Sequence, residues 1–435
     1  MRFAPHTDDE IRDMLAVIGR SSVSELFDQI PASVRLERGL DIPPGVSEME
    51  LVADMRGLAA ADRHVDDLVC FAGGGAYDHY VPSVVWALAG RSEFYTSYTP
   101  YQPELSQGVL QVLFEYQSMI CELTGMDVSN ASLYDGASAL VEAVHMTLTS
   151  ERMRVLVSNG VDPRALDTLR TAGRGAGYEP EVFHGAPSPT PDVAAVVVQH
   201  PNVYGILEPV RGHFAATHEA GAKAIQMFDP LSLGVLAPPG ELDADIAVGE
   251  GQGLGNHLNY GGPYLGILAA RMADVRKMPG RIVGETIDVD GDVGYVLTLQ
   301  AREQHIRRDK ANSNICTNQT LMAIAATVYL GWLGPQGLEE LGRQCASKAA
   351  FTASELSKIP GVSMAFPGTR SFKEFAVRVP RSAVAVRDEM VSRGFLAGVP
   401  MPLAGDDVLV VAVTERRSRA EIERYVSAMG EVLAS

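Results

Sequence analysis

The segment from Glu93 to Gln107 combines residue types suited to a binding or catalytic surface. It reads Glu-Phe-Tyr-Thr-Ser-Tyr-Thr-Pro-Tyr-Gln-Pro-Glu-Leu-Ser-Gln and shows no period that would place its aromatic rings in a core. Proline restricts the backbone and tyrosine carries a hydroxyl group on a rigid ring, so this segment would hold polar groups in place at a low entropic cost. We interpret it as an active-site wall or a subunit interface.

The size and charge of the chain limit its possible partners. Its 435 residues predict more than one structural region. The 36 basic and 54 acidic side chains give a formal charge of -18, which disfavours binding to nucleic acid or to an anionic membrane.

The four scattered cysteines show no zinc-ligand spacing, so we predict reduced thiols and no metal site. Without a secretion signal or an apolar run long enough to cross a bilayer, the sequence predicts a soluble cytoplasmic protein.

The hydrophobic pattern changes twice along the chain. Residues from about 8 to 65 carry apolar positions at helical spacing and predict a mainly helical arm. From about 130 to 270, helical and strand patterns alternate, which indicates a mostly parallel sheet covered by helices. The apolar run 194–198 fits a strand buried on both faces. A long helix from about 319 to 333 leads to a last part in which strands and helices alternate again.

These regions predict an arm at 1–70, a large α/β domain at 71–330 and a small C-terminal α+β domain at 331–435. This outline resembles that of pyridoxal-phosphate (PLP) enzymes of the aspartate-aminotransferase type, which is fold type I. Such enzymes need a helix N-terminus for the cofactor phosphate, an acid at a strand end for the pyridine nitrogen, and a lysine that holds the cofactor.

The first two of these features have candidates that also have simpler explanations. The loop 133–138 runs into a predicted helix, but Asp135 is a natural N-cap whose carboxylate would compete with a phosphate. Asp229 follows a predicted strand, where the partner of the pyridine nitrogen would lie. The alternative is that Asp229 caps a turn before Pro230.

The third feature, the lysine, is absent from its expected place. It should lie in the segment 245–257, which contains no lysine, and the sequence has none between Lys223 and Lys277. The sequence therefore predicts that this chain does not hold the cofactor itself.

Several distinctive motifs are spread along the chain: 94–104, 130–135, 249–252 with 261–266, and 302–308 continuing into 313–319. Together they resemble the P proteins of the glycine cleavage system, the glycine decarboxylases. The length of the chain matches subunit 1 of their two-subunit form.

The resemblance implies a division of labour between two subunits that share a fold. Subunit 2 carries the lysine and PLP, and the present chain would complete that site from across the interface. The complex would act as glycine dehydrogenase (decarboxylating). It would decarboxylate glycine and transfer the aminomethyl group to the lipoyl group (lipoate) of the H protein, and it would be active only with both subunits present. We expect a heterotetramer with two copies of each subunit.

The resemblance also implies which residues reach the partner's site. Contacts near the glycine or the lipoyl arm are expected from Tyr95, Tyr98, Thr99, Tyr101 and Gln102. The alternative for the tyrosines is packing. Contacts with the phosphate of the partner's cofactor are expected from Ser313, Asn314 and Thr317. The alternative is that this loop only caps the following helix, with Thr317 as the N-cap.

Two other functions remain open. One is an independent PLP enzyme that uses an unusual lysine, for which Lys310 in the arginine-rich loop is the candidate. This function requires cofactor absorbance in the isolated chain. The other is a non-catalytic scaffold or regulatory protein, in which mutation of Tyr98 or Asn314 would leave the rate of the assembled complex unchanged.

Overall fold

The computed structural model describes residues 6–36, 38–311, 313, 315 and 317–434. Contacts within the chain divide it into two units, Met1–Arg63 and His64–Ser435.

The first unit consists of short helices joined by extended chain. Its helices are α1 (Asp8–Val17), the 3-10 helix η1 (Val23–Phe27) and α2 (Glu48–Ala59). Capping boxes start α1 and α2, with Thr7 and Ser47 as the N-caps. The prediction of a mainly helical arm is wrong for the described part of the chain between η1 and α2, where three prolines oppose a helix.

The apolar side chains of the first unit are almost all exposed. Among its described residues only Leu15 is buried, whereas Met14 and Ile18, on the same predicted stripe, are exposed. Large apolar side chains also lie exposed along η1 and α2, including Phe27, Met55 and Leu58. The described residues of this unit therefore form no hydrophobic core of their own.

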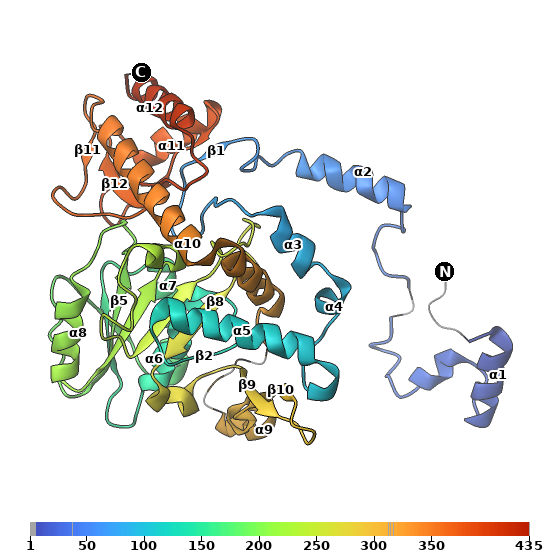
Figure 1. The fold of residues 1–435 in the computed structure, drawn as a ribbon. Coiled ribbons are helices and arrows are strands. Elements are labelled where there is room, and N and C mark those ends of the chain that lie inside the picture. The colour runs from blue at the N-terminus through green and yellow to red at the C-terminus, as the bar shows by residue number, and fades with distance from the viewer. Residues whose placement is uncertain (1–5, 37, 312, 314, 316, 435) are drawn as a thin grey trace. The chain divides into compact units, whose positions relative to one another are not determined.

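A seven-stranded sheet forms the centre of the second unit (Figure 1). Its strands, in spatial order, are β2 (Val128–Ser129), β8 (Gly266–Ala270), β7 (Ile246–Glu250), β6 (Lys223–Phe228), β5 (Val193–His200), β3 (Arg154–Ser158) and β4 (Pro180–Phe183). All neighbours from β7 to β4 pair in parallel, and β8 is antiparallel to both β7 and β2. The predicted mostly parallel sheet is confirmed, and the run 194–198 is buried within β5.

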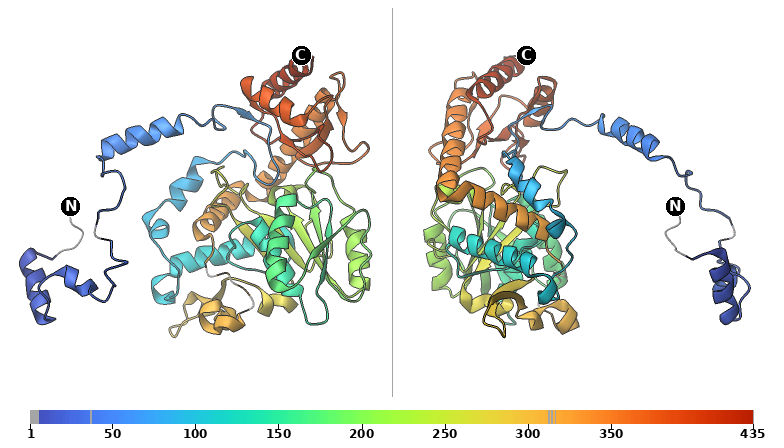
Figure 2. Two further views of the ribbon diagram at one scale, coloured as in Figure 1. Left: turned by 180° about the vertical axis from the view of Figure 1, so that it is seen from behind. Right: turned by 45° about the vertical axis from the view of Figure 1, so that its right-hand side comes forward.

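Helices cover both faces of this sheet, as Figures 1 and 2 show. On one face lie α6 (Gly136–Thr147) and α7 (Pro163–Ala176). On the other lie α5 (Gln107–Thr124), α8 (Val210–Glu219) and the first half of α10 (Thr320–Leu356). Strand β5 contributes to both cores, because Val197 packs in the first and Val198 in the second.

Short elements complete this part of the unit. They are α3 (Ser83–Ala89), α4 (Ser92–Tyr95), η2 (Pro103–Leu105), η3 (Pro230–Gly234), η4 (Met272–Lys277), the hairpin of β9 (Ile282–Ile287) and β10 (Val293–Thr298), η5 (Gln300–Arg302), α9 (Gln304–Arg307) and η6 (Arg308–Lys310).

The C-terminal part is a smaller α+β arrangement. Its antiparallel sheet has the order β11 (Ser363–Met364), β12 (Glu374–Arg378), β15 (Val408–Ala412) and β14 (Val399–Pro400). Helices α11 (Ala383–Ser392) and α12 (Arg419–Ala434) share a core with it. Strand β1 (Val69–Cys70) pairs in parallel with β13 (Phe395–Leu396). The domain boundaries at 70/71 and 330/331 stay predictions.

Helix α10 is longer than the sequence pattern indicated. It continues beyond 333 through a kink at Gly334, where φ is 61°, and at Pro335. By length and composition it is the one helix among the described residues that could span a membrane, which differs from the prediction of no such run. Much of it is buried against η3, α3 and α5, as is common for a core helix.

Candidate functional site

The segment from Glu93 to Gln107 comprises the end of α4, a connecting loop that contains η2, and the first residue of α5. Tyr95 and Tyr98 are 68% and 82% exposed, and Gln102 is also exposed. Gln107 fixes the end of the loop, because its side-chain amide donates to the carbonyl groups of Pro103 and Tyr295. The tyrosines named here are therefore not packed inside this chain.

Two other residues of the loop are held by a buried arginine. The Nη2 atom of Arg281 donates to the hydroxyl oxygen of Thr99 at 3.3 Å, and its guanidinium group lies 5.6 Å from the centre of the Tyr101 ring. His305 of α9 packs edge-on against the same ring. Thr99 and Tyr101 are thus positioned, whereas Tyr95 and Tyr98 extend into solvent.

The second predicted loop approaches the same arginine. The Nη1 atom of Arg281 donates to the side-chain oxygen of Asn318 at 2.8 Å. Thr317 is exposed. Burial raises the pKa of Glu142, and a hydrogen bond from Ser313 opposes that rise, so the Ser313 hydroxyl group has a partner within this chain. Asn314, the third predicted contact, lies outside the described residues.

The alternative role of Thr317 as the N-cap of α10 is wrong. The helix begins at Thr320 with Gln319 as its N-cap and without a side-chain cap. The backbone N–H of Gln319 donates instead to the hydroxyl oxygen of Ser132, at 3.2 Å.

At the carboxyl edge of the central sheet, the amino end of α6 is occupied by carboxylates. Asp135 is the N-cap, as predicted, and accepts from the N–H of Ser138 at 2.7 Å. Glu250, at the end of β7, accepts from the N–H groups of Gly136, Gln252 and Leu265. Burial raises the pKa of Glu250 to about 7. Two carboxyl groups thus accept hydrogen bonds from the backbone N–H groups that would otherwise be available to bind a phosphate.

The acid at the end of β6 also has a partner within the chain. Asp229 caps η3 by accepting from the N–H of Leu231, and its carboxylate lies 2.6 Å from the Nζ atom of Lys373. The Lys373 side chain is only 2% exposed and lies over the ring of Tyr77, with Nζ 3.5 Å from its centre. Nζ also lies 3.0 Å from Nε2 of His79. The sequence did not predict a role for Lys373 at this site, because Lys373 lies far along the chain from Asp229.

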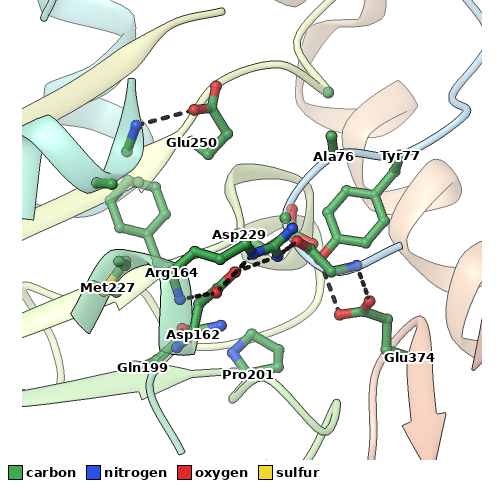
Figure 3. Close-up of a pocket in the computed structure, with 18 of the residues that line it drawn as sticks. Ala76, Tyr77, Asp162, Arg164, Gln199, Pro201, Met227, Asp229, Glu250 and Glu374 are labelled. Atoms are coloured by element: carbon green, nitrogen blue, oxygen red, sulfur yellow. Dashed lines mark hydrogen bonds and ion pairs between the residues drawn. The ribbon is translucent and has the colours of Figure 1, made fainter. Parts of the chain in front are cut away.

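These residues line a cavity of about 390 Å³ (Figure 3). Its described lining holds five carboxyl groups and two cationic side chains: Asp135, Asp162, Asp229, Glu250 and Glu374, with Arg164 and Lys373. The lining does not fit PLP. A carboxylate occupies the place of the phosphate, the excess of acids repels a phosphate ester, and Lys373 already pairs with the acid.

One cluster in the described residues has the donor set of a metal site, although the cysteine spacing predicted none. The ligand atoms of His79, Cys345 and Glu415 lie within 4.8 Å of one another. Nδ1 of His79 is 2.6 Å from Glu415, and the Cys345 thiol donates to the same carboxylate oxygen at 3.7 Å. Burial raises the pKa of Cys345 to about 12, so the thiol is protonated at neutral pH. We interpret the cluster as a hydrogen-bonded network beside Lys373.

Comparison with known proteins adds independent evidence. The family model "Glycine cleavage system P-protein" matches residues 1–429. A probable glycine dehydrogenase (decarboxylating) subunit 1 from Chlorobium limicola is 48% identical over 99% of both chains. A similar relative from Desulforamulus reducens is 47% identical over 99% of this chain and 100% of that protein.

Solved structures agree with these relatives. A crystal structure of glycine decarboxylase (P-protein) of the glycine cleavage system, in inhibitor-bound form, superposes with a TM-score of 0.94. It is 44% identical and covers all of both chains. Aspartate aminotransferase from Thermus thermophilus superposes with a TM-score of 0.59 at 18% identity, over 84% of this chain and 99% of that one, which shows a common fold. The predicted aspartate-aminotransferase-like fold is confirmed.

Proposed function

Because the chain belongs to the glycine cleavage system P-protein family, and within it to the subunit 1 chains of glycine dehydrogenase (decarboxylating), we propose that it completes a PLP site carried by a partner subunit. PLP on that partner would supply the electron sink for decarboxylation of glycine. The complex would then pass the aminomethyl group to the lipoyl group of the H protein. In this proposal the chain contributes walls and hydrogen-bond donors, and it is active only in the assembled complex.

The observation that carries this proposal is that side chains of this chain already bond the groups in the cavity that a cofactor would use. Glu250 accepts a hydrogen bond from the N–H of Gly136 at the amino end of α6, and Lys373 forms an ion pair with Asp229. A chain with this cavity is suited to assist a cofactor site elsewhere rather than to hold one. The exposed loop from Glu93 to Gln107 offers the polar aromatic surface that such assistance needs.

Within this proposal, the exposed side chains of the loop contact the glycine or the lipoyl arm. Tyr95, Tyr98 and Gln102 are exposed, while Thr99 and Tyr101 are held in place by Arg281. The loop before α10 would contact the cofactor phosphate of the partner. Its exposed residue Thr317 is the best-placed donor among its described residues, because Ser313 already bonds to Glu142.

Exposed apolar side chains support the presence of a partner subunit. The first unit exposes most of its large apolar side chains, and in the second unit Leu105 and Trp332 are also exposed. Such surfaces favour protein–protein contact. We propose an assembly of two copies of each subunit, located in the cytoplasm.

Covalent trapping of PLP tests the proposal. The chain is purified alone and together with a lysine-bearing subunit 2, incubated with PLP and reduced with borohydride. Mass spectrometry then locates the label, and exchange of CO₂ into glycine is measured with lipoylated H protein. We expect label only on the partner and exchange only in the mixture. Label and exchange activity in the isolated chain would contradict the proposal.

The alternative of an independent PLP enzyme is opposed by the carboxylates of the cavity lining, and it would need a lysine of this chain at the cavity. Lys373 lines the cavity beside Asp229, so Lys373 replaces the predicted Lys310, which lies in η6, as the candidate lysine. The same experiment separates the two functions, because only an independent enzyme would carry label on Lys373 and work alone.

A further inference from the structure

Arg281 is a buried arginine that joins segments distant in the sequence. It lies just before β9, and the residue is 3% exposed. Its guanidinium group donates to Thr99 in the loop after α4 and to Asn318 in the segment before α10. The same group lies against the ring of Tyr101. One side chain therefore links both loops that the proposed function places at the partner's site.

The surroundings of Arg281 hold it in one place. Its carbonyl oxygen accepts from the N–H of Ala131 at 2.8 Å. Asn318 is fixed in turn, because its side-chain amide donates to the Ser132 hydroxyl oxygen at 2.8 Å and its oxygen accepts from Thr320 at 3.0 Å. The network therefore extends from the Thr99 loop to the start of α10 without depending on a flexible side chain at the surface.

The chemistry of the guanidinium group suits this position. It is planar and offers several donors in fixed directions, so it can bond Thr99 and Asn318 at once while its charge lies 5.6 Å from the centre of the Tyr101 ring. A lysine at this position would present a single ammonium group without this fixed set of donors.

We propose that Arg281 is a positioning residue that sets the distance between the Thr99 loop and the Thr317 segment, and thereby the shape of the wall that this chain gives to the partner's site. This proposal rests on the proposed function, because it concerns the same wall. Arg281 acts through Thr99, Tyr101 and Asn318 and does not itself contact the substrate.

The test compares Arg281→Met and Arg281→Lys in the assembled complex. Exchange of CO₂ into glycine is measured over a range of glycine and H protein concentrations, to separate kcat from KM. We expect Arg281→Met to lower kcat/KM about tenfold to hundredfold, because small misplacements of positioning groups cost this much. Arg281→Lys should recover part of the loss. Assembly with subunit 2, measured by light scattering, should remain unchanged.

Arg271→Met is the matched control. The Arg271 side chain donates to the backbone carbonyl groups of Gly125 and Gly240, and it lies outside both loops. We expect its kcat/KM to stay within about twofold of the wild type, although its stability falls as surface hydrogen bonds are lost. Equal losses in both variants, no loss in Arg281→Met, or loss of assembly in Arg281→Met would each overturn the proposal.

A second measurement does not depend on activity. Hydrogen–deuterium exchange is measured on the isolated chain for peptides that cover 96–105 and 317–323. We expect Arg281→Met to speed exchange in both peptides about fivefold, the effect of losing about 1 kcal/mol of local stability. Arg271→Met should not do so. Faster exchange without any activity of the wild-type complex would refute the proposed function but support the link, and unchanged exchange would refute the link.

Discussion

At the scale of single residues, the buried carboxyl group of Glu374 is expected to make stability depend on pH. Its oxygens accept from the N–H of Gly74 at 2.7 Å and the hydroxyl group of Tyr77 at 2.9 Å. Burial raises its pKa from 4.5 to about 7. Between these values the folded state binds more protons than the unfolded state, so stability falls as the pH rises from about 4.5 to about 7 and is level above that.

Glu374→Gln should reduce this pH dependence. Glutamine can accept from the N–H of Gly74 and donate to the Tyr77 hydroxyl group, so both hydrogen bonds are kept. We expect the loss of unfolding free energy between pH 5 and pH 8 to shrink by on the order of 2 kcal/mol, measured by urea denaturation. Part of the slope should remain, because burial also raises the pKa of Glu250 to about 7. An equal slope in both proteins would contradict this assignment.

Tyr98 tests the exposed loop at the same scale. Because its side chain is 82% exposed, Tyr98→Ala should change the unfolding free energy of the isolated chain by less than about 0.5 kcal/mol. In the assembled complex we expect CO₂ exchange to fall about tenfold or more, since the ring would line the partner's site. Tyr260→Ala, at an equally exposed tyrosine outside the loop, is the control. Full activity of the Tyr98 variant in an intact complex would favour the scaffold function.

At the scale of elements, local patterns predicted much of the second unit. Asp135 caps the start of α6, as its place before the predicted helix indicated. The alternating patterns between 130 and 270 appear as the central sheet and its helices, and the apolar run 194–198 lies in β5. These features depend on neighbours in the sequence, which is why spacing and capping chemistry reveal them.

The contacts that define the site are not local, and spacing could not predict them. Lys373 precedes β12 and reaches Asp229 after β6, whereas Arg281 precedes β9 and reaches Thr99. Glu250 lies in the motif 249–252, but nothing near it in the sequence indicates that it accepts from the N–H of Gly136. The partner of a charged residue is apparent only once the chain is folded. The lack of a lysine in the segment 245–257 could therefore be read from the sequence, but the contacts of Glu250 and Lys373 could not.

The ion pair of Lys373 joins the C-terminal part to the central sheet and predicts a coupled effect on stability. Lys373→Met leaves the Asp229 carboxylate, itself mostly buried, without its cation. We expect a loss of about 3 kcal/mol, because removal of one partner of a buried pair strands the other charge. The double variant Asp229→Asn with Lys373→Met should recover more than half of that loss. Additive losses in a urea-denaturation cycle would show that the pair is not coupled.

At the scale of the whole molecule, the two units differ in how they bury apolar side chains. All four hydrophobic clusters formed by the described residues lie in the second unit, His64–Ser435. The described residues of the first unit bury only Leu15 and expose large apolar side chains along their helices. An isolated short helix is marginal in water without a packed face. The first unit therefore gains the most from a surface supplied by another chain.

Deletion of residues 1–63 tests this role. Since the hydrophobic clusters of the described residues lie in the second unit, we expect the truncated chain to keep a cooperative thermal transition within a few degrees of the full chain. Its affinity for subunit 2 should fall about hundredfold or more, because exposed apolar side chains are lost from the interface. The affinity is measured by analytical ultracentrifugation, with Met14→Ala as a milder variant. Equal affinity of the truncated and full-length chains would show that the first unit does not contact the partner, and it would leave the exposed loop and α10 as the surface for assembly.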